Sequence, residues 1–332
     1  MWFEKLVGFE EISPTQVREN ITIDGEFIIS KVNGNKYRCG KLELSSLENL
    51  RKIAPPGDNS FGQLTVTEVV GDISVLHKDM SNKGAVFQAA SQFNLLEMVG
   101  PQISPEKGVG IYEYDKTQGP ACAIACGAGT IYRNYFVDLH GQKGQTENSQ
   151  IDCLEELGFY FGNINDNLWE MRNGYALVTR TGLSIIDQKI KSLSAGQYDL
   201  VKGKLKVGIQ KNTQVTISYD GLLVTQVYCS ALPIAYSSID YIKWESFARL
   251  ILEATYEATF HVALQNFHQT GNKILYLTLV GGNAFGNPSA WIFDAIRKSL
   301  DKFSTVPLDV RMVSYKKSNP DTAEFIRSFY NK

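Results

Sequence analysis

In the second half of the chain, apolar runs of strand length alternate with longer stretches of helical periodicity. Residues 222–229 have the composition of a buried strand, and residues 244–265 carry apolar positions close to the helical period. The pattern then predicts a strand, a helix, a strand and a helix in turn, at residues 273–279, 289–303, 308–315 and 322–330. This alternation predicts an α/β fold: a three-layer α/β/α sandwich with a mixed, largely parallel central sheet.

The first 60 residues have the character of an N-terminal extension. Residues 26–32 are strand-like, Asn33-Gly34 favours a tight turn, and residues 37–42 provide a return strand. A short helix is expected at residues 47–53. We therefore expect a β-hairpin extension over residues 1–60, packed on a domain of residues 61–332 that carries an insertion at about 138–220.

Two strands and a helix complete the expected core. Residues 64–70 form a strand that ends at Gly71, and residues 84–90 are almost wholly apolar, as in a strand buried on both faces. Residues 121–133 mix Ala, Cys, Gly and Ile and predict a tightly packed helix. Between them, residues 99–122 are rich in Gly, Pro and polar groups, and loops of this length usually carry function.

Composition narrows the classes of partner. The formal net charge of −2 gives no broad basic field, so we expect no nucleic-acid partner. We expect no membrane partner either, because no apolar run approaches the roughly 20 residues that span a bilayer. The five cysteines are scattered without metal-ligand spacing, so no metal is expected. We expect a cytoplasmic monomer, or one delivered to a host cytosol if the chain is a secreted effector.

The loop of residues 281–288 is the strongest candidate for a binding site, because ligands of open α/β sheets bind beyond the carboxyl ends of the strands. Its glycines let the backbone approach a ligand, and the following helix begins with a positive dipole end that suits a diphosphate. Phe285 can stack on an adenine or a ribose. A tight turn without a ligand remains an alternative. The candidate residues are Gly281, Gly282, Asn283, Ala284, Phe285, Gly286 and Asn287.

Two more loops follow predicted strands. Asp72, beside Ile73, can accept a hydrogen bond from an exocyclic amine such as that of adenine, or it can cap a turn. Asn94 can hold a ribose hydroxyl or serve as an ordinary turn former. Glu97, three residues later, can act as an acid or a base.

The loop of residues 112–120 adds the carboxylates of Glu113 and Asp115, with Gln118 and Gly119 as further ligand-binding candidates. Breaking an N-glycosidic bond to ribose develops positive charge at the anomeric carbon. One carboxylate can stabilise that charge and another can activate water. Glu97, Glu113 and Asp115 are therefore candidate catalytic residues, although charged loop residues are often only solvated.

Taken in order, these segments resemble a macrodomain over residues 64–315. The resemblance rests on Gly71-Asp72-Ile73 at a strand end, on residues 86–94, and on Phe285-Gly286-Asn287-Pro288 before a helix. Residues 88–100 and 115–135 resemble the poly(ADP-ribose)-glycohydrolase-like branch, and within it the bacterial-effector macrodomains that remove ADP-ribose from arginine. The chain departs from the branch in lacking a Gly-Gly-Gly stretch that leads to paired glutamates.

The resemblance implies ADP-ribose as ligand or product and no required cofactor. It implies that Asp72 holds the adenine amine and that the 281–286 loop holds the diphosphate. Asn94 and Glu97 would face the distal ribose, and Asp115 would be the leading catalytic carboxylate.

By the same resemblance, we expect an ADP-ribosyl hydrolase that acts on modified protein side chains, arginine among them. Its partner would be an ADP-ribosylated protein, such as a ubiquitin-like or another arginine-modified protein. Two alternatives stay open at this point. One is a reader module that binds ADP-ribose without chemistry, and the other is a hydrolase of a small ADP-ribose derivative.

Overall fold

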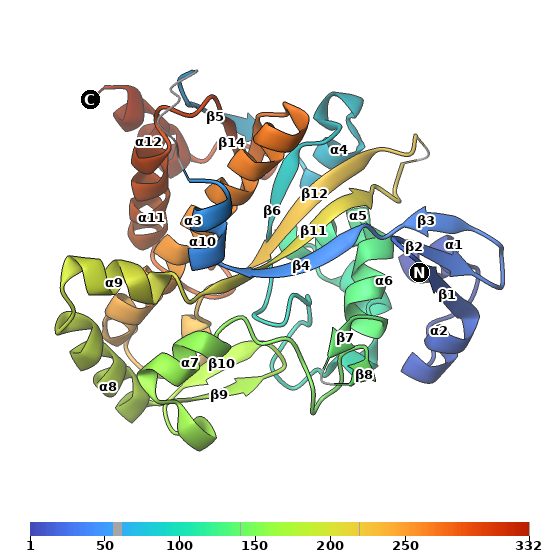
Figure 1. The fold of residues 1–332 in the computed structure, drawn as a ribbon, viewed down its shortest axis with the longest axis horizontal. Helices are drawn as coiled ribbons and strands as arrows, with labels where there is room; N and C mark the ends of the chain where they lie inside the picture. The colour runs from blue at the N-terminus through green and yellow to red at the C-terminus, as the bar shows by residue number, and fades with distance from the viewer. Residues whose placement is uncertain (56–61, 140, 219, 332) are drawn as a thin grey trace.

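The protein is described here from a computed structural model, which covers residues 1–55, 62–139, 141–218 and 220–331. A mixed seven-stranded sheet forms its centre, in the order β4-β11-β12-β6-β13-β14-β5 (Figure 1). Neighbouring strands from β12 to β5 are parallel, whereas β11 runs antiparallel to both β12 and β4. The strands are β4 (Lys41–Ser46), β5 (Thr65–Val70), β6 (Val86–Ala90), β11 (Lys206–Gln214), β12 (Leu223–Cys229), β13 (Ile274–Leu277) and β14 (Asp309–Ser314).

Helices cover both faces of this sheet, which confirms the predicted three-layer α/β/α class (Figure 1). One layer contains α3 (Leu47–Ile53), α10 (Glu245–Thr270), α11 (Ser289–Lys302) and α12 (Pro320–Tyr330). The other contains α4 (Ile73–Lys78), α5 (Gln118–Ala125) and α6 (Gly127–Tyr135). Among the described residues, no helix combines the length and the apolarity that crossing a membrane demands.

The centre of the sheet is buried, as its sequence requires. Val86, Phe87 and Ala89 of β6 are fully buried, in agreement with the apolar run. The polar residue in this strand, Gln88, is satisfied because its Nε2 donates to Thr259 Oγ1 of α10 at 3.0 Å. A buried polar side chain therefore ties the central strand to the central helix.

The N-terminal hairpin is confirmed, in a slightly larger unit. It comprises α1 (Trp2–Val7), α2 (Pro14–Asn20) and an antiparallel sheet of β1 (Ile21–Asp24), β2 (Phe27–Ser30) and β3 (Lys36–Arg38). The predicted return strand at residues 37–42 is split at Gly40, which has a φ of 75°. A Cβ there would lie 2.1 Å from the carbonyl oxygen of Lys211, so only glycine fits. Beyond it, β4 joins the central sheet, so residues 41–53 of the expected extension belong to the core layers.

The region expected as an insertion forms a lobe below the sheet (Figure 1). It contains β7 (Asp138–Leu139), β8 (Gln142–Lys143), α7 (Glu155–Phe161), β9 (Trp169–Arg172), β10 (Tyr175–Val178), α8 (Arg180–Lys191) and α9 (Ala195–Lys202). Its last part is β11, a central strand that the sequence analysis missed. Short 3₁₀ helices complete the fold: η1 (Met80–Asn82), η2 (Pro105–Lys107), η3 (Gly110–Tyr114), η4 (Ile164–Asp166), η5 (Ile234–Tyr236) and η6 (Tyr241–Trp244).

Candidate functional site

Two adjoining cavities lie beyond the carboxyl ends of the parallel strands. The inner cavity, of about 170 Å³, lies beyond β6 and β13. The outer cavity, of about 550 Å³, lies beyond β5 and β14. They share a wall made of Thr117, Gln118, Thr278, Leu279 and Asn283. Together they make a cleft of two adjoining parts at the edge of the sheet where α/β proteins bind ligands.

The loop that follows β6 lines one side of the inner cavity. The Gln118 side chain fixes its start, because Oε1 accepts from Ala90 N at 3.0 Å and Nε2 donates to Gln88 O at 2.8 Å. The Gln92 side chain stabilises the loop through two hydrogen bonds to the backbone of Met98. Leu95 has a φ of 64°, a strained value for a branched residue, and it marks the tight reversal of this loop.

Asn94 does not line the cleft, which corrects its expected role at the ribose. Its side chain is fully buried behind the loop, where Nδ2 donates to Gln150 Oε1 at 2.8 Å and Oδ1 accepts from Leu96 N at 3.1 Å. Asn94 therefore acts as a turn former, which was the alternative interpretation of this residue. Arg133 of α6 assists it by donating to Leu95 O at 3.2 Å from a fully buried position. Both residues hold the loop in shape and neither reaches a ligand in the cleft.

Glu97 is the buried carboxyl of the site. It lines the inner cavity, its side chain is 5% exposed, and its Oε1 has no hydrogen-bond partner among the described residues. Burial raises the pKa of Glu97 well above the usual carboxyl value, and the nearby charge of Asp115 adds to the shift. The positive charge of Arg133 opposes this effect without cancelling it. A protonated carboxyl with a free oxygen is suited to donate a proton.

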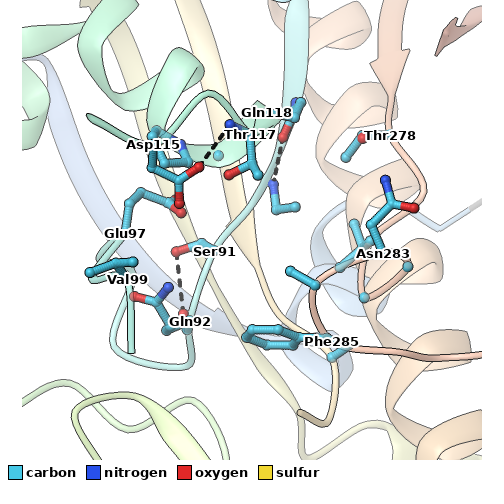
Figure 2. A pocket seen from close by; sticks show the side chains of 18 of the residues that line it. Ser91, Gln92, Glu97, Val99, Asp115, Thr117, Gln118, Thr278, Asn283 and Phe285 are labelled. Atoms are coloured by element: carbon cyan, nitrogen blue, oxygen red, sulfur yellow. Dashed lines mark hydrogen bonds between the residues drawn. The ribbon is translucent and has the colours of Figure 1, made fainter. Parts of the chain in front are cut away.

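Asp115 and Glu97 lie on the same wall of the inner cavity (Figure 2). Asp115 is half-buried, and its Oδ1 accepts from the backbone N–H of Thr117 at 2.8 Å. Glu113 points elsewhere: its Oε2 accepts from Trp2 N at 2.9 Å, and it lines none of the described cavities. The structure therefore brings together two of the three predicted carboxylates and assigns Glu113 to the anchoring of the N-terminus.

The opposite wall consists of the glycine-rich loop, with Asn283 and Phe285 facing the carboxylates across the cavity (Figure 2). Gly281 has a φ of 78°, and a Cβ there would lie 2.3 Å from the Cβ of Ala231. Among the described residues, no acceptor is found for the backbone N–H groups of Asn283 and Ala284. Free amides at an exposed loop provide donors for an anionic group.

Not every predicted residue of this loop reaches the cleft. The inner cavity is lined by Gly281 through Phe285, but Gly286 and Asn287 lie behind it. Asn287 closes the loop instead, because its Nδ2 donates to the carbonyl oxygens of Leu232 and Gly281, each at 2.9 Å. The start of α11 is likewise absent from the cavity lining. The donors are thus loop amides, and the expected role of the helix terminus is not met.

Asp72 and Ile73, two further candidate ligand-binding residues, line the outer cavity. Asp72 is half-buried at the start of α4, and its Oδ1 accepts from Ser74 N at 2.8 Å and from Ser74 Oγ at 2.7 Å. It therefore caps the helix with one oxygen, and no partner within the described chain is found for the other. Both predicted interpretations of Asp72, turn cap and ligand acceptor, are compatible with this geometry.

Gly119 is required by close packing at the inner end of the cleft. A Cβ at this position would lie 2.0 Å from Ala90 O and 2.3 Å from Glu97 Oε2. The helix α5 can therefore approach the carboxyl of Glu97 only because this residue lacks a side chain. Gln118 and Gly119, both candidate ligand-binding residues, line the inner cavity.

Aromatic side chains that no sequence pattern predicts line one side of the cleft. Tyr175 from β10 and Tyr236 from η5 line the inner cavity together with Phe285. Their rings form a cluster with centroid separations of 5.1 to 5.8 Å. In the outer cavity, Tyr315 and Lys317 were also missed. No local motif marks these residues, because they converge from distant segments only in the folded chain.

No metal-binding arrangement is present in the part of the chain that the structure describes: no three His, Cys, Asp or Glu side chains are grouped to hold an ion. The five cysteines are buried as free thiols.

Comparisons with known proteins give similarity at the level of structure alone. No protein-family model and no curated protein matches the chain. Among solved structures, poly(ADP-ribose) glycohydrolase from Deinococcus radiodurans in complex with ADP-ribose is similar, with a TM-score of 0.46, 12% identity, and coverage of 87% of this chain and 93% of that one. The enzyme from Thermomonospora curvata bound to the inhibitor ADP-HPD has a TM-score of 0.44 and 11% identity, covering 96% and 97% of the two chains. At these values, the function has to be argued from the residues of the cleft.

Proposed function

We propose that the cleft binds ADP-ribose and that the chain hydrolyses the glycosidic bond at its distal ribose, as a macrodomain-like ADP-ribosyl hydrolase. One observation carries the proposal. A buried carboxyl with a raised pKa, Glu97, lies beside the half-buried Asp115 in the lining of the inner cavity. Two carboxyls in unequal environments are the arrangement that glycoside hydrolysis uses.

The dimensions and polarity of the cleft support this ligand. The outer cavity offers Asp72 to an adenine amine and the ring of Tyr315 to an aromatic base. The free amides of Asn283 and Ala284 lie in the middle and suit a diphosphate. The smaller inner cavity then takes the distal ribose against the two carboxyls.

The reaction follows from the two environments. Glu97 gives its proton to the leaving atom as the bond from that atom to the anomeric carbon breaks. Asp115 stabilises the positive charge on the ribose and takes a proton from the water that adds to the same carbon. The products are ADP-ribose and the protonated acceptor. The acceptors that we propose are modified protein side chains, with arginine as the first to be tested.

Calorimetry and turnover test the two parts of the proposal separately. ADP-ribose should bind more tightly than AMP or NAD, and Gly282→Glu should abolish binding because it places a negative charge beside the loop amides. Gly196→Glu is the matched control, since this glycine lies on α9 with nothing within 4 Å of its Cβ position. Failure to bind ADP-ribose at all would contradict the proposal.

Turnover is then measured on arginine-, glutamate- and serine-linked ADP-ribose. We expect Asp115→Asn to reduce the rate by about 100-fold or more while leaving ADP-ribose bound. Binding without turnover of any conjugate would indicate a reader module instead.

A further inference from the structure

A third cavity, which we call the side groove, borders the same two carboxyls. It has a volume of about 510 Å³ and shares Glu97, Val99 and Asp115 with the inner cavity. The two carboxyls therefore line both cavities. If the ribose occupies the inner cavity, the side groove is a second space beside the carboxyls in which the other half of the broken bond can lie.

We infer that the side groove binds the polypeptide segment that carries the ADP-ribose, and that it favours acidic residues beside the modified side chain. This inference rests on the proposed function. It names the class of substrate: a modified protein or peptide, with recognition extending beyond the nucleotide to the sequence around the attachment point.

Apolar surface in the groove supports a polypeptide as the occupant. Val99 is 62% exposed and Tyr114 is 73% exposed, and Ile103 and Ile111 continue the same lining. Exposed apolar side chains gathered beside a reaction centre are typical of a surface that packs against a partner. A further unit of a nucleotide polymer would instead bring a second diphosphate, and the described lining has no two consecutive backbone amides without an acceptor, as Asn283 and Ala284 have.

Charge determines which segment fits. The basic groups of the lining are Lys107 and Lys116. The ammonium group of Lys116 is engaged, because it donates to the carbonyl oxygen of Glu113 at 2.7 Å. Lys107 is exposed at the end of η2, and no partner for its side chain is found in the described part of the chain. A free cation at the rim of an apolar groove complements an acidic residue that flanks the modified position.

A charge-swap experiment tests this directly. Two peptides carry ADP-ribose on the same residue, one with acidic and one with basic flanking residues, and a third substrate is ADP-ribose joined to the free amino acid. The enzymes are the wild type, Lys107→Glu and the control Lys143→Glu, which reverses an exposed charge on β8 outside the described cavities.

For the wild type, we expect kcat/KM to be about fivefold higher on the acidic peptide than on the basic one, as for an exposed charge pair. Lys107→Glu should reverse this order, and Lys143→Glu should not. All three enzymes should treat the amino-acid conjugate alike. The preference should also fade in about 0.5 M salt, because the charges are exposed. In a second variant, Tyr114→Ser should raise KM for both peptides and leave the amino-acid conjugate unaffected.

An unchanged peptide preference in Lys107→Glu, together with an unchanged KM in Tyr114→Ser, would overturn the inference while leaving the hydrolase itself intact. Preferential cleavage of an ADP-ribose polymer that is weakened by Lys107→Glu would also overturn it, by assigning the groove to a nucleotide chain. If no conjugate is hydrolysed but ADP-ribose still binds, the catalytic part of the proposed function fails. The peptide preference is then read from the affinities of the same conjugates.

Discussion

Burial of Glu97 acts in opposite directions on the proposed reaction and on folding. Because its pKa is raised in the folded protein, the carboxyl keeps its proton at a pH where an unfolded glutamate is ionised. The folded state therefore binds more protons than the unfolded state. The stability associated with this group is fully present below the unfolded pKa of about 4.5 and is lost as the pH rises toward the raised value.

Glu97→Gln should separate these effects. At about pH 7, turnover should fall by about 100-fold, whereas the free energy of unfolding should rise by an amount on the order of 1 kcal/mol, because no buried carboxyl has to hold a proton. The stability gain should disappear at about pH 4, where the unfolded glutamate is protonated as well. Thermal unfolding of both proteins at the two pH values measures it. A gain that is independent of pH would show that the raised pKa is not its origin.

For single residues, the sequence predicted the position of side chains that directly follow a strand or turn. It failed for side chains whose hydrogen-bond partner is distant in the chain. Asp72 and Asp115 follow strands or turns directly and line the cleft. Asn94 has the same local pattern, but Gln150, distant in sequence, takes its side chain out of the cleft. Glu113 is likewise occupied by the backbone of Trp2. The aromatic residues of the cleft carry no pattern that precedes the fold.

Among the elements, the N-terminal unit contacts η3, the segment that leads to Asp115. Glu11 lies between α1 and α2, and its carboxyl accepts from Val109 N at 2.9 Å, from Gly110 N at 2.6 Å and from Tyr135 OH at 2.6 Å. These bonds fix the start of η3, which leads directly to Asp115. The extension is thus part of the support for the site.

Glu11→Ala should therefore lower kcat by about tenfold while changing the affinity for ADP-ribose little, because the bonds position Asp115 and do not touch the nucleotide. The exposed neighbour Glu10→Ala is the control. Calorimetric binding and initial rates give the two readouts. A parallel loss of binding and rate would indicate general unfolding of the loop and would contradict a positioning role.

Element boundaries were predicted well where apolar periodicity is strong and poorly where polar residues are buried. Helix α3 and strands β5, β6, β12 and β14 lie where the pattern placed them. Strand β11 was missed because it carries Gln210, which is fully buried and donates to Cys39 O at 2.8 Å. The helix expected at residues 121–133 is two helices, α5 and α6, because Cys126 has non-helical dihedral angles.

Across the whole molecule, one ionic cluster joins segments from three parts of the chain to the central helix. Glu257 of α10 is 3% exposed. Its carboxylate contacts Arg51 of α3, Lys202 of α9 and Lys302 of α11. Burial alone would raise the pKa of Glu257, but hydrogen bonds from Arg51 and Lys302 and the charge of Lys202, with the His261 ring nearby, outweigh it and hold the pKa far below the usual value.

Acid should therefore weaken the packing of the helical layer. A carboxylate with a lowered pKa contributes stability that is present above its unfolded pKa of about 4.5 and is lost as the pH falls below it. At about pH 7, Glu257→Gln should cost about 3 kcal/mol, because it leaves buried cations without their counter-charge. The exposed pair of Glu324 and Arg327 offers a control, and Glu324→Gln should cost less than about 0.5 kcal/mol.

The pH dependence distinguishes a charge effect from a packing effect. Between about pH 7 and about pH 4, the difference in unfolding free energy between the wild type and Glu257→Gln should shrink, because the unfolded wild-type glutamate takes up a proton that the folded one resists. Urea titrations at each pH measure this difference. A constant difference would mean that the amide merely packs worse in the same space. A shrinking one would mean that the attraction of Glu257 for Arg51, Lys202 and Lys302 holds helices α3, α9 and α11 against α10.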